Sequence, residues 1–163
     1  MNPPDHPAVR RVQRALEAAG HAQKPQWLQD SAHTAQQAAD SLGVPLGAIA
    51  KSVVLALPGG AVLCVTAGDR RVNAALLPVE LGLAGRADAN GVRRHTGFAI
   101  GGVSPLGFEP APGFEPPTVL IDPSLWRFET VWAAAGHPRA LFAATPDQLI
   151  ELAGARRHAF TDD

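Results

Sequence analysis

The spacing of apolar residues divides the chain into short helices, short strands and one long loop. Near the N-terminus apolar residues recur every three or four positions, which is typical of a helix with one buried face. Two almost continuous apolar runs flank Pro58-Gly59-Gly60, which predicts a β-hairpin. Residues 97–117 are dominated by Gly, Pro and Phe and predict a long loop, and long ordered loops are often functional. On these grounds we predict helices over residues 7–19, 35–42, 73–80, 88–95 and between Thr145 and Gly154, and strands over residues 52–57, 61–66, 118–121, 129–134 and 140–143.

Capping signals support two of these helices, and three other segments are harder to interpret. Thr34-Ala-Gln-Gln37 and Thr145-Pro-Asp-Gln148 both place Thr three residues before Gln, which is the spacing of a capping box. Trp27-Leu28 fits either a short strand or an anchoring loop, and residues 45–50 fit a turn or a short helix. Residues 155–163 predict a frayed tail.

The order of these elements indicates the fold class. Strands do not alternate regularly with helices, which favours a mixed α+β domain over a doubly wound parallel sheet. The chain has 163 residues, an ordinary size for one domain, and it shows neither an internal repeat nor a linker. We therefore predict a single domain over residues 1–163.

Composition and charge exclude several classes of protein. The single cysteine, Cys64, excludes an internal disulfide framework, and its apolar neighbours indicate a small buried side chain. The formal net charge of −1 argues against strong non-specific binding to nucleic acid. No apolar run is long enough to cross a membrane, and the first ten residues carry prolines and charges where a signal peptide is apolar. We therefore expect a cytoplasmic protein.

Lys51 is the first candidate for chemistry, because it precedes an apolar strand. One interpretation is an ordinary strand-edge lysine that extends its ammonium group to water. The other is a cation held against an apolar wall and directed at a phosphate or a carbonyl group, where partial desolvation strengthens its field. Composition alone leaves both interpretations open.

The glycine-rich run from Gly101 to Gly107 is the second candidate. Glycines such as Gly101 and Gly102 allow the backbone to approach a ligand closely, and Pro105 stiffens the far end. Such a loop can present N–H groups to an oxygen that becomes negative, although a plain structural turn has the same composition. The spacing fits neither phosphate-binding motif, GxGxxG or Walker A, and Ser104 does not lie in a GxSxG elbow.

Three further positions carry groups that suit substrate binding. His137 lies between Gly and Pro, which fix its backbone, although a lone histidine in a turn is usually just exposed. Asp122 precedes Pro123 at the end of a strand, where Asp usually caps a turn. Asp69 and Arg70 lie in a polar loop that fits either a solvated surface or a contact to RNA phosphates. The histidines show no metal-binding spacing and no Ser–His–Asp arrangement is evident, so we expect neither a metal nor another cofactor.

Five motifs together resemble the YbaK/ProX family of aminoacyl-tRNA deacylases, which also occurs as the editing insertion domain of bacterial prolyl-tRNA synthetases. They fall in family order, cover roughly residues 30–153, and are specific only in combination. The motifs are Thr34-Ala-Gln-Gln-Ala-Ala, Ile49-Ala-Lys51-Ser52, Gly68-Asp-Arg-Arg-Val72, Gly101-Gly-Val-Ser-Pro-Leu-Gly107 and Ala135-Gly-His137.

The resemblance implies a mixed, β-barrel-like sheet surrounded by helices and a set of site residues. Lys51 corresponds to the family lysine near the terminal adenosine of the tRNA. Gly101 and Pro105 fit the loop that holds the aminoacyl carbonyl, and His137 fits a pocket histidine of some members. We accordingly predict that Lys51, Gly101, Gly102 and His137 are catalytic, and that substrate-binding residues are Ser104, Pro105, Asp69, Arg70 and Asp122.

The resemblance also implies an activity and its partners. The expected function is that of a free-standing enzyme that hydrolyses the ester of a mischarged tRNA, with tRNA-Pro carrying a small amino acid such as Ala or Cys as the expected substrate. The motifs do not fix the amino acid, so Ser or a larger residue stays an alternative. Its partners are the acceptor end of aminoacyl-tRNA and, as alternatives, prolyl-tRNA synthetase or an elongation factor. A non-catalytic module that binds a tRNA end or a nucleotide, and a general small-ester hydrolase, remain competing hypotheses. Asn73 departs from the acidic residue of many relatives, and the aromatic residues of 97–117 could narrow the pocket.

Overall fold

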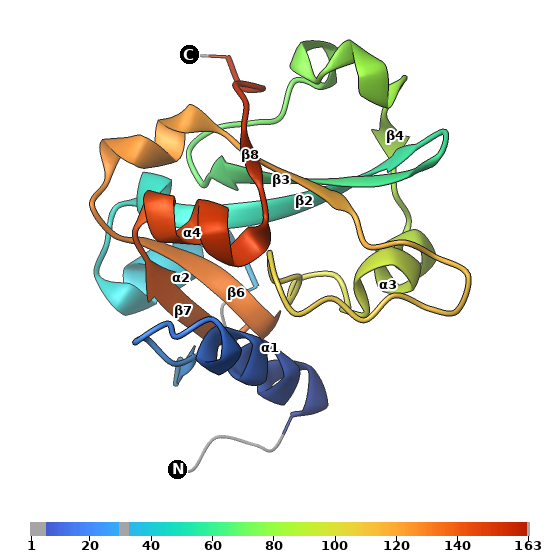
Figure 1. Ribbon diagram of the computed structural model, residues 1–163. Helices are drawn as coiled ribbons and strands as arrows, with labels where there is room; N and C mark the ends of the chain where they lie inside the picture. The colour runs from blue at the N-terminus through green and yellow to red at the C-terminus, as the bar shows by residue number, and fades with distance from the viewer. Residues whose placement is uncertain (1–5, 30–32, 163) are drawn as a thin grey trace.

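The computed structural model describes residues 6–29 and 33–162, and within them a single mixed sheet runs through the molecule (Figure 1). The strands are short apart from the central hairpin, and the helices lie around the sheet. The helices are α1 (Pro7–Ala18), α2 (Ala35–Leu42), α3 (Ala89–Thr96) and α4 (Pro146–Ala153). The strands are β1 (Gln26–Trp27), β2 (Ile49–Leu57), β3 (Gly60–Ala67), β4 (Gly85–Arg86), β5 (Thr118–Ile121), β6 (Val131–His137), β7 (Ala140–Ala144) and β8 (Arg156–Arg157). The expected α+β class with a mixed sheet surrounded by helices is confirmed.

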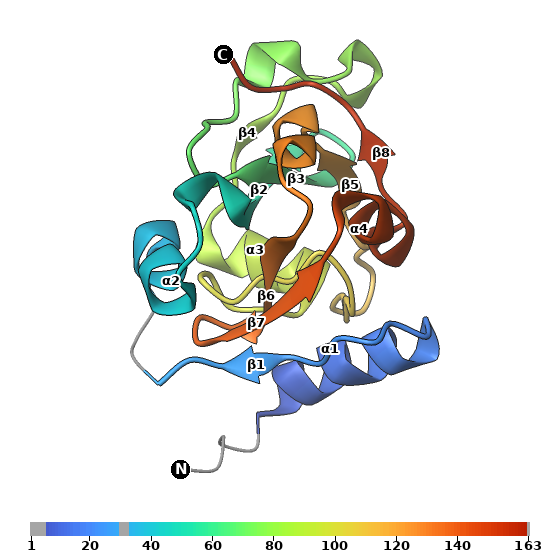
Figure 2. The ribbon, with the colours of Figure 1, turned by 90° about the vertical axis from the view of Figure 1, so that its left-hand side faces the viewer.

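The β2–β3 hairpin forms the centre of the sheet. Its strands pair antiparallel from Ala50 opposite Ala67 to Leu57 opposite Gly60. Outside the hairpin, β6 runs parallel to β2 and β5 runs parallel to β3, which gives the order β1-β7-β6-β2-β3-β5-β8 (Figure 2). The sheet therefore combines two antiparallel hairpins with parallel pairings between distant segments.

One edge of β2 is shared by two strands that do not meet. β6 pairs with it at Ile49–Ala50, and β4 pairs with it at Leu55–Ala56. Within the described residues, positions 51–54 of β2 have no strand partner on this edge. The sheet thus opens locally beside Lys51, which positions the candidate site described below.

The core lies between the sheet and the helices that cover it. In α1, Val9, Val12 and Leu16 are buried, and α1 packs against β6. Cys64 is fully buried in the strand β3, as expected, and burial raises the pKa of its thiol to about 12. No helix among the described residues has the length and apolar character needed to cross a lipid bilayer.

Most of the predicted elements are confirmed, and the local signals explain why. Thr34 caps α2 by accepting a hydrogen bond from the N–H of Gln37, although the Gln37 side chain accepts from His33 rather than completing the box. At α4 the full capping box with Thr145 is present. Trp27 lies in a short strand, and Leu46–Ala48 forms one turn of 3₁₀ helix. The long loop over 97–117 contains neither helix nor strand.

The prediction of a helix over residues 73–80 is wrong, and the short strand β4 was not predicted. In place of a helix over 73–80 there are two single turns of 3₁₀ helix, Ala74–Leu76 and Val79–Leu81. Pro78 lies between them, and because it lacks an N–H and restricts the preceding residue, a continuous helix cannot form. The two-residue strand β4 has too little sequence to produce a recognisable pattern.

The C-terminal segment is ordered by contacts to the sheet, so the prediction of a frayed tail over 155–163 is wrong as far as the described residues extend. β8 pairs parallel with β5, and Phe160 is fully buried. The Asp122 carboxylate accepts hydrogen bonds from the N–H groups of Phe160, at 2.9 Å, and of Thr161, at 3.2 Å. These partners are about 40 positions apart in the chain, which is why local periodicity gave no sign of them.

Candidate functional site

A cavity of about 380 Å³ lies beside the open edge of β2. Its wall combines the N-terminal end of α2, the start of β2, the glycine-rich loop and the β6–β7 hairpin. The lining residues are His33, Thr34, Ala35, Ala38, Ile49, Ala50, Lys51, Ser52, Gly101, Val103, Ala134, Pro138 and Leu141. Most of these side chains are apolar, so the cavity suits a small apolar group flanked by a few polar contacts.

Lys51 lies where the strand edge opens. It is half-buried on β2 and pairs with Thr66 of β3. Among the described residues, no Asp or Glu forms an ion pair with its ammonium group. An ammonium group at an apolar wall attracts a negatively charged or polarised oxygen of a ligand more strongly than it would in bulk water.

The glycine-rich loop forms the wall opposite the open edge. Gly101 is exposed and has φ = +95°, a conformation that favours glycine. Gly102 is buried, and a Cβ at its position would lie 2.8 Å from backbone atoms of Gly136 and His137. The backbone of the loop therefore packs directly on the C-terminal end of β6, a closeness that only glycine allows.

Ser104 and Pro105 are buried within the same loop. The Ser104 hydroxyl accepts a hydrogen bond from the N–H of Leu106 at 3.2 Å. Neither residue belongs to the cavity lining, whereas the neighbouring Val103 does. The two residues thus contribute to the packing of the loop and not to the wall of the cavity.

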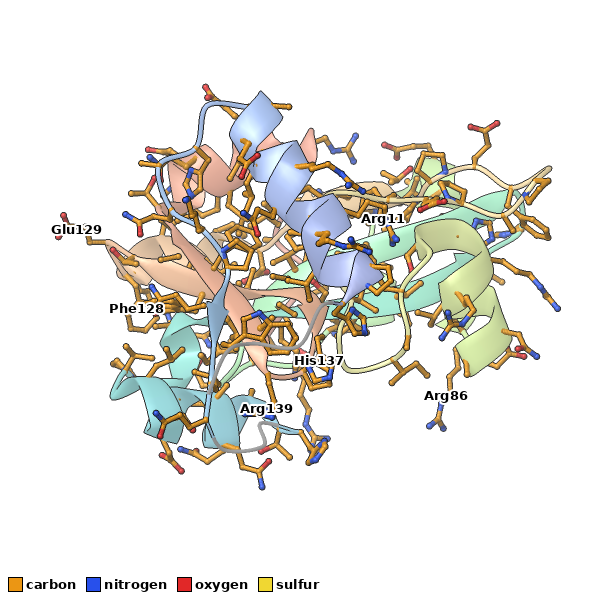
Figure 3. All side chains as sticks on the ribbon, turned by 90° about the horizontal axis from the view of Figure 1, so that it is seen from below. Arg11, Arg86, Phe128, Glu129, His137 and Arg139 are labelled. Carbon is orange, nitrogen blue, oxygen red and sulfur yellow. The ribbon has the colours of Figure 1, made fainter. Side chains whose placement is uncertain are left out.

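His137 is the last residue of β6 rather than part of a turn, and it is not among the residues that line the cavity. Its ring centroid is 5.1 Å from those of both His6 and Trp27, and its Nδ1 accepts a hydrogen bond from the N–H of Arg139 at 3.0 Å. Desolvation, together with the positive potential of His6 and Arg139, lowers the pKa of the imidazole. A neutral ring with Nδ1 as acceptor carries its proton on Nε2. Figure 3 shows His137 and Arg139 below α1.

Asp69, Arg70 and Asp122 lie outside the Lys51 cavity. Arg127 holds Asp69 through two hydrogen bonds of 2.7 and 3.0 Å, and these bonds lower the pKa of the Asp69 carboxyl. Arg70 donates a hydrogen bond to the carbonyl of Asp162. Asp122 is 2% exposed and anchors the C-terminal segment. The structure therefore brings Lys51 and Gly101 to one cavity and gathers these three residues in a separate region.

Sequence reasoning missed two polar contributors to the cavity. His33 precedes α2 and is, with Lys51, one of the two lining residues that carry a titratable side chain. Ser52 lies next to Lys51, and its hydroxyl oxygen is buried without a hydrogen-bond partner among the described residues. Its place directly after Lys51 in the Ile49-Ala-Lys51-Ser52 motif is the signal that could have identified it.

A second cavity, of about 330 Å³, continues along the open edge towards α3. It shares Lys51, Ser52, Gly101 and Val103 with the first cavity, and Arg86 and Ile100 lie in its wall. Lys51 and Gly101 thus stand where the two spaces meet. Within residues 6–29 and 33–162, no group of three His, Cys, Asp or Glu side chains converges to hold a metal ion.

Comparisons with known proteins agree with this architecture. Residues 29–152 match the family model described as an aminoacyl-tRNA editing domain. The uncharacterised protein YwhH of Bacillus subtilis strain 168 is 37% identical over 124 residues, which are 75% of this chain and 76% of that protein. A solved structure of a protein proposed to be a trans-editing enzyme for prolyl-tRNA synthetase is 38% identical, with a TM-score of 0.88 over 98% of this chain and 100% of that one. The structure of the hypothetical protein APE2540 is 27% identical, with a TM-score of 0.81 over 93% and 99% of the two chains.

Proposed function

The chain belongs to the aminoacyl-tRNA editing domain family, and we propose that it is a deacylase that hydrolyses the ester of a mischarged tRNA. The observation that carries the proposal is the position of Lys51 and Gly101 on one small, largely apolar cavity. A space of about 380 Å³ accommodates an amino acid and part of the terminal ribose, while the tRNA remains outside. The solved trans-editing relative supports the same assignment.

The backbone of the glycine-rich loop supplies electrostatic stabilisation in this proposal. When water attacks the carbonyl carbon of the ester, that carbonyl oxygen becomes negative. The N–H group of Gly101 then stabilises it, whereas that of Gly102 donates to the carbonyl of Ala99 at 3.1 Å. Removal of one oxyanion donor typically costs about 10²–10³ in rate. The tetrahedral intermediate collapses as the bond to the ribose oxygen breaks. That oxygen leaves as a tRNA hydroxyl, with the proton released by the water.

Lys51 supplies the positive charge on the opposite wall. It holds the phosphate or ribose end of the tRNA, and its charge also lowers the energy of the developing oxyanion. An aminoacyl ester is already activated, so a water oriented by substrate hydroxyls is a sufficient nucleophile. His137 acts through the backbone contact between the C-terminal end of β6 and Gly102.

The apolar lining sets the size of the accepted amino acid. Ala38, Ile49 and Leu141 leave space for a small side chain, so we propose Ala or Cys on tRNA-Pro as the substrate. A difference of one methylene is worth only about 1–3 kcal/mol in such a pocket. The protein therefore acts as a second sieve for errors that a synthetase cannot exclude, with prolyl-tRNA synthetase as the proposed source of the substrate.

A deacylation panel tests the proposal. Purified protein is mixed with tRNA-Pro charged with Ala, Cys, Ser, Thr or Pro, and with the cognate tRNAs of the first four amino acids. We expect release from Ala- or Cys-tRNA-Pro and a loss of at least about a hundredfold in Lys51→Ala, because charge stabilisation at the oxyanion is removed. Lys24→Ala is the matched control, since Lys24 is the other lysine of the sequence and is exposed.

Each alternative gives a different outcome. Saturable tRNA binding with no turnover on any charged species would refute the deacylase and favour a binding module. Hydrolysis of simple esters that is independent of tRNA would favour a general esterase. Full activity of Lys51→Ala would show that Lys51 is not a site residue, without contradicting the proposed deacylase activity.

A further inference from the structure

Arg11 of α1 connects both ends of the glycine-rich loop. Its Nε donates a hydrogen bond to the carbonyl of Gly107 at 2.8 Å, and its Nη2 donates to the carbonyl of Gly97 at 3.1 Å. Between these two carbonyls the chain runs through Gly101, which lines the Lys51 cavity, and Gly102, which packs on the backbone of Gly136 and His137. One side chain therefore closes the base of the loop (Figure 3).

The surroundings of Arg11 fix the guanidinium in this position. It stacks over the ring of Phe98 at 4.7 Å and forms an ion pair with Glu109 at 3.2 Å. Its side chain is only 20% exposed, so its hydrogen bonds are shielded from water. A lysine has no planar fork of donors and could not reach two carbonyls in the same way.

Two glycines allow α1 to approach this closely. A Cβ at Gly97 would lie 3.0 Å from Nη2 of Arg11, and a Cβ at Gly107 would lie 3.3 Å from Cα of Val12. Both glycines have positive φ, at +79° and +76°. The glycines at both ends of the loop thus allow its backbone to pack directly against α1.

The same helix also supports the end of β6 that lies against Gly102. A Cβ at Gly136 would lie 2.8 Å from the carbonyl carbon of Ala8 in the first turn of α1. Because Gly136 also lies against Gly102, α1, the end of β6 and the loop are in continuous backbone contact. Yet α1 lies outside residues 29–152, the segment that the editing-domain family model matches.

We propose that Arg11 is a positioning residue for the reaction: it holds the backbone of the Gly101–Gly102 segment in place, and thereby keeps the N–H group of Gly101 at the oxyanion position. The inference rests on the proposed function. Arg11 touches no substrate atom and acts only through the carbonyls of Gly97 and Gly107. Its loss lets the loop ends separate, and misplacement of a catalytic group by about 1 Å costs about a hundredfold in rate.

Steady-state kinetics on mischarged tRNA test this role. We expect Arg11→Ala to lower kcat by about tenfold to a hundredfold while KM changes little, because the loop stabilises the transition state more than it binds the substrate. Arg11→Lys should not restore kcat, whereas added guanidinium, well below denaturing concentration, should partly restore Arg11→Ala. Arg14→Ala, an exposed arginine on the same helix, should behave as wild type. An unchanged kcat in Arg11→Ala, or a defect that guanidinium does not relieve, would overturn the proposal.

Amide hydrogen exchange separates this inference from the proposed function. It is measured over residues 98–107 in the full chain, without any substrate. Faster exchange in Arg11→Ala than in Arg14→Ala supports the positioning role, even if no mischarged tRNA is hydrolysed by the wild type. Equal exchange in the two variants overturns it, even if the wild type proves to be an active deacylase.

Discussion

Replacement of Gly102 by alanine changes a single methyl group at the closest backbone contact of the site. The added Cβ would lie 2.8 Å from the carbonyl carbon and oxygen of Gly136 and from the nitrogen of His137. All three are backbone atoms, so no side chain can rotate away. The loop must therefore move relative to the C-terminal end of β6.

The size of this movement follows from the contact distances. Ordinary van der Waals contact begins near 3.4 Å, so the backbones must separate by about 0.6 Å or more. Such overpacking destabilises a protein by about 1–3 kcal/mol. Because catalytic N–H groups move with the loop, a displacement approaching 1 Å also costs up to about a hundredfold in rate. Gly102→Ala should thus lose both stability and activity.

Thermal unfolding and deacylation kinetics together measure both effects. For a chain of this size each kcal/mol lowers Tm by about 2–4 °C, so the variant should melt about 2–12 °C below wild type. Its kcat should decrease by much more than the small fraction of unfolded protein at the assay temperature can explain. Gly59→Ala is the control, because a Cβ at Gly59 meets nothing within 4 Å. A lower Tm with wild-type kcat would refute the assignment of this backbone to the site.

Two further predictions concern buried polar groups. Asp122→Ala leaves the N–H groups of Phe160 and Thr161 without their acceptor and should cost about 3 kcal/mol in urea unfolding; wild-type stability would show that the tail is held by packing alone. Burial opposes the charge of Asp122, but hydrogen bonds from Ser124, Phe160 and Thr161 outweigh it and lower the pKa of its carboxyl. The ionised Asp122 carboxylate therefore stabilises the fold above the unfolded-state pKa of about 3.9, and this stabilisation is lost as pH falls below it. The difference in unfolding free energy between wild type and Asp122→Asn should accordingly shrink from pH 7 to pH 3. Ser52→Ala removes a buried hydroxyl without a partner, so Tm should stay constant or rise, and a clear decrease would reveal an acceptor that the described residues do not show.

Local patterns predicted the elements whose signals are complete within one segment. The helix over residues 7–19 and the hairpin around Pro58-Gly59 follow from periodicity and turn chemistry, and both are confirmed. The C-terminal tail was misjudged because its order depends on β5 and Asp122, which lie in a different part of the chain. Pairings of this kind leave no periodic trace.

The candidate site shows the same division. Lys51 and the glycine-rich loop are 50 positions apart, and their motifs were related only through the resemblance to a family, whereas the structure places them on one cavity. Asp69 was considered for the site because of its motif, but Arg127, 58 positions away, pairs with it elsewhere. The link from Arg11 to Gly97 and Gly107 spans more than 80 positions and has no sequence signature.

The pairing of β8 with β5 determines at which stage of synthesis the protein can complete its fold. During synthesis a chain leaves the ribosome in N-to-C order, so β5 and Asp122 emerge before Arg156, Arg157 and Phe160. Until then Asp122 lacks its tail partners and the cluster around Cys64 lacks its Phe160 side chain. The sheet therefore stays open on the β5 side until β8 and Phe160 have been made, and a ribosome that stalls between Asp122 and Phe160 holds a chain with an open core.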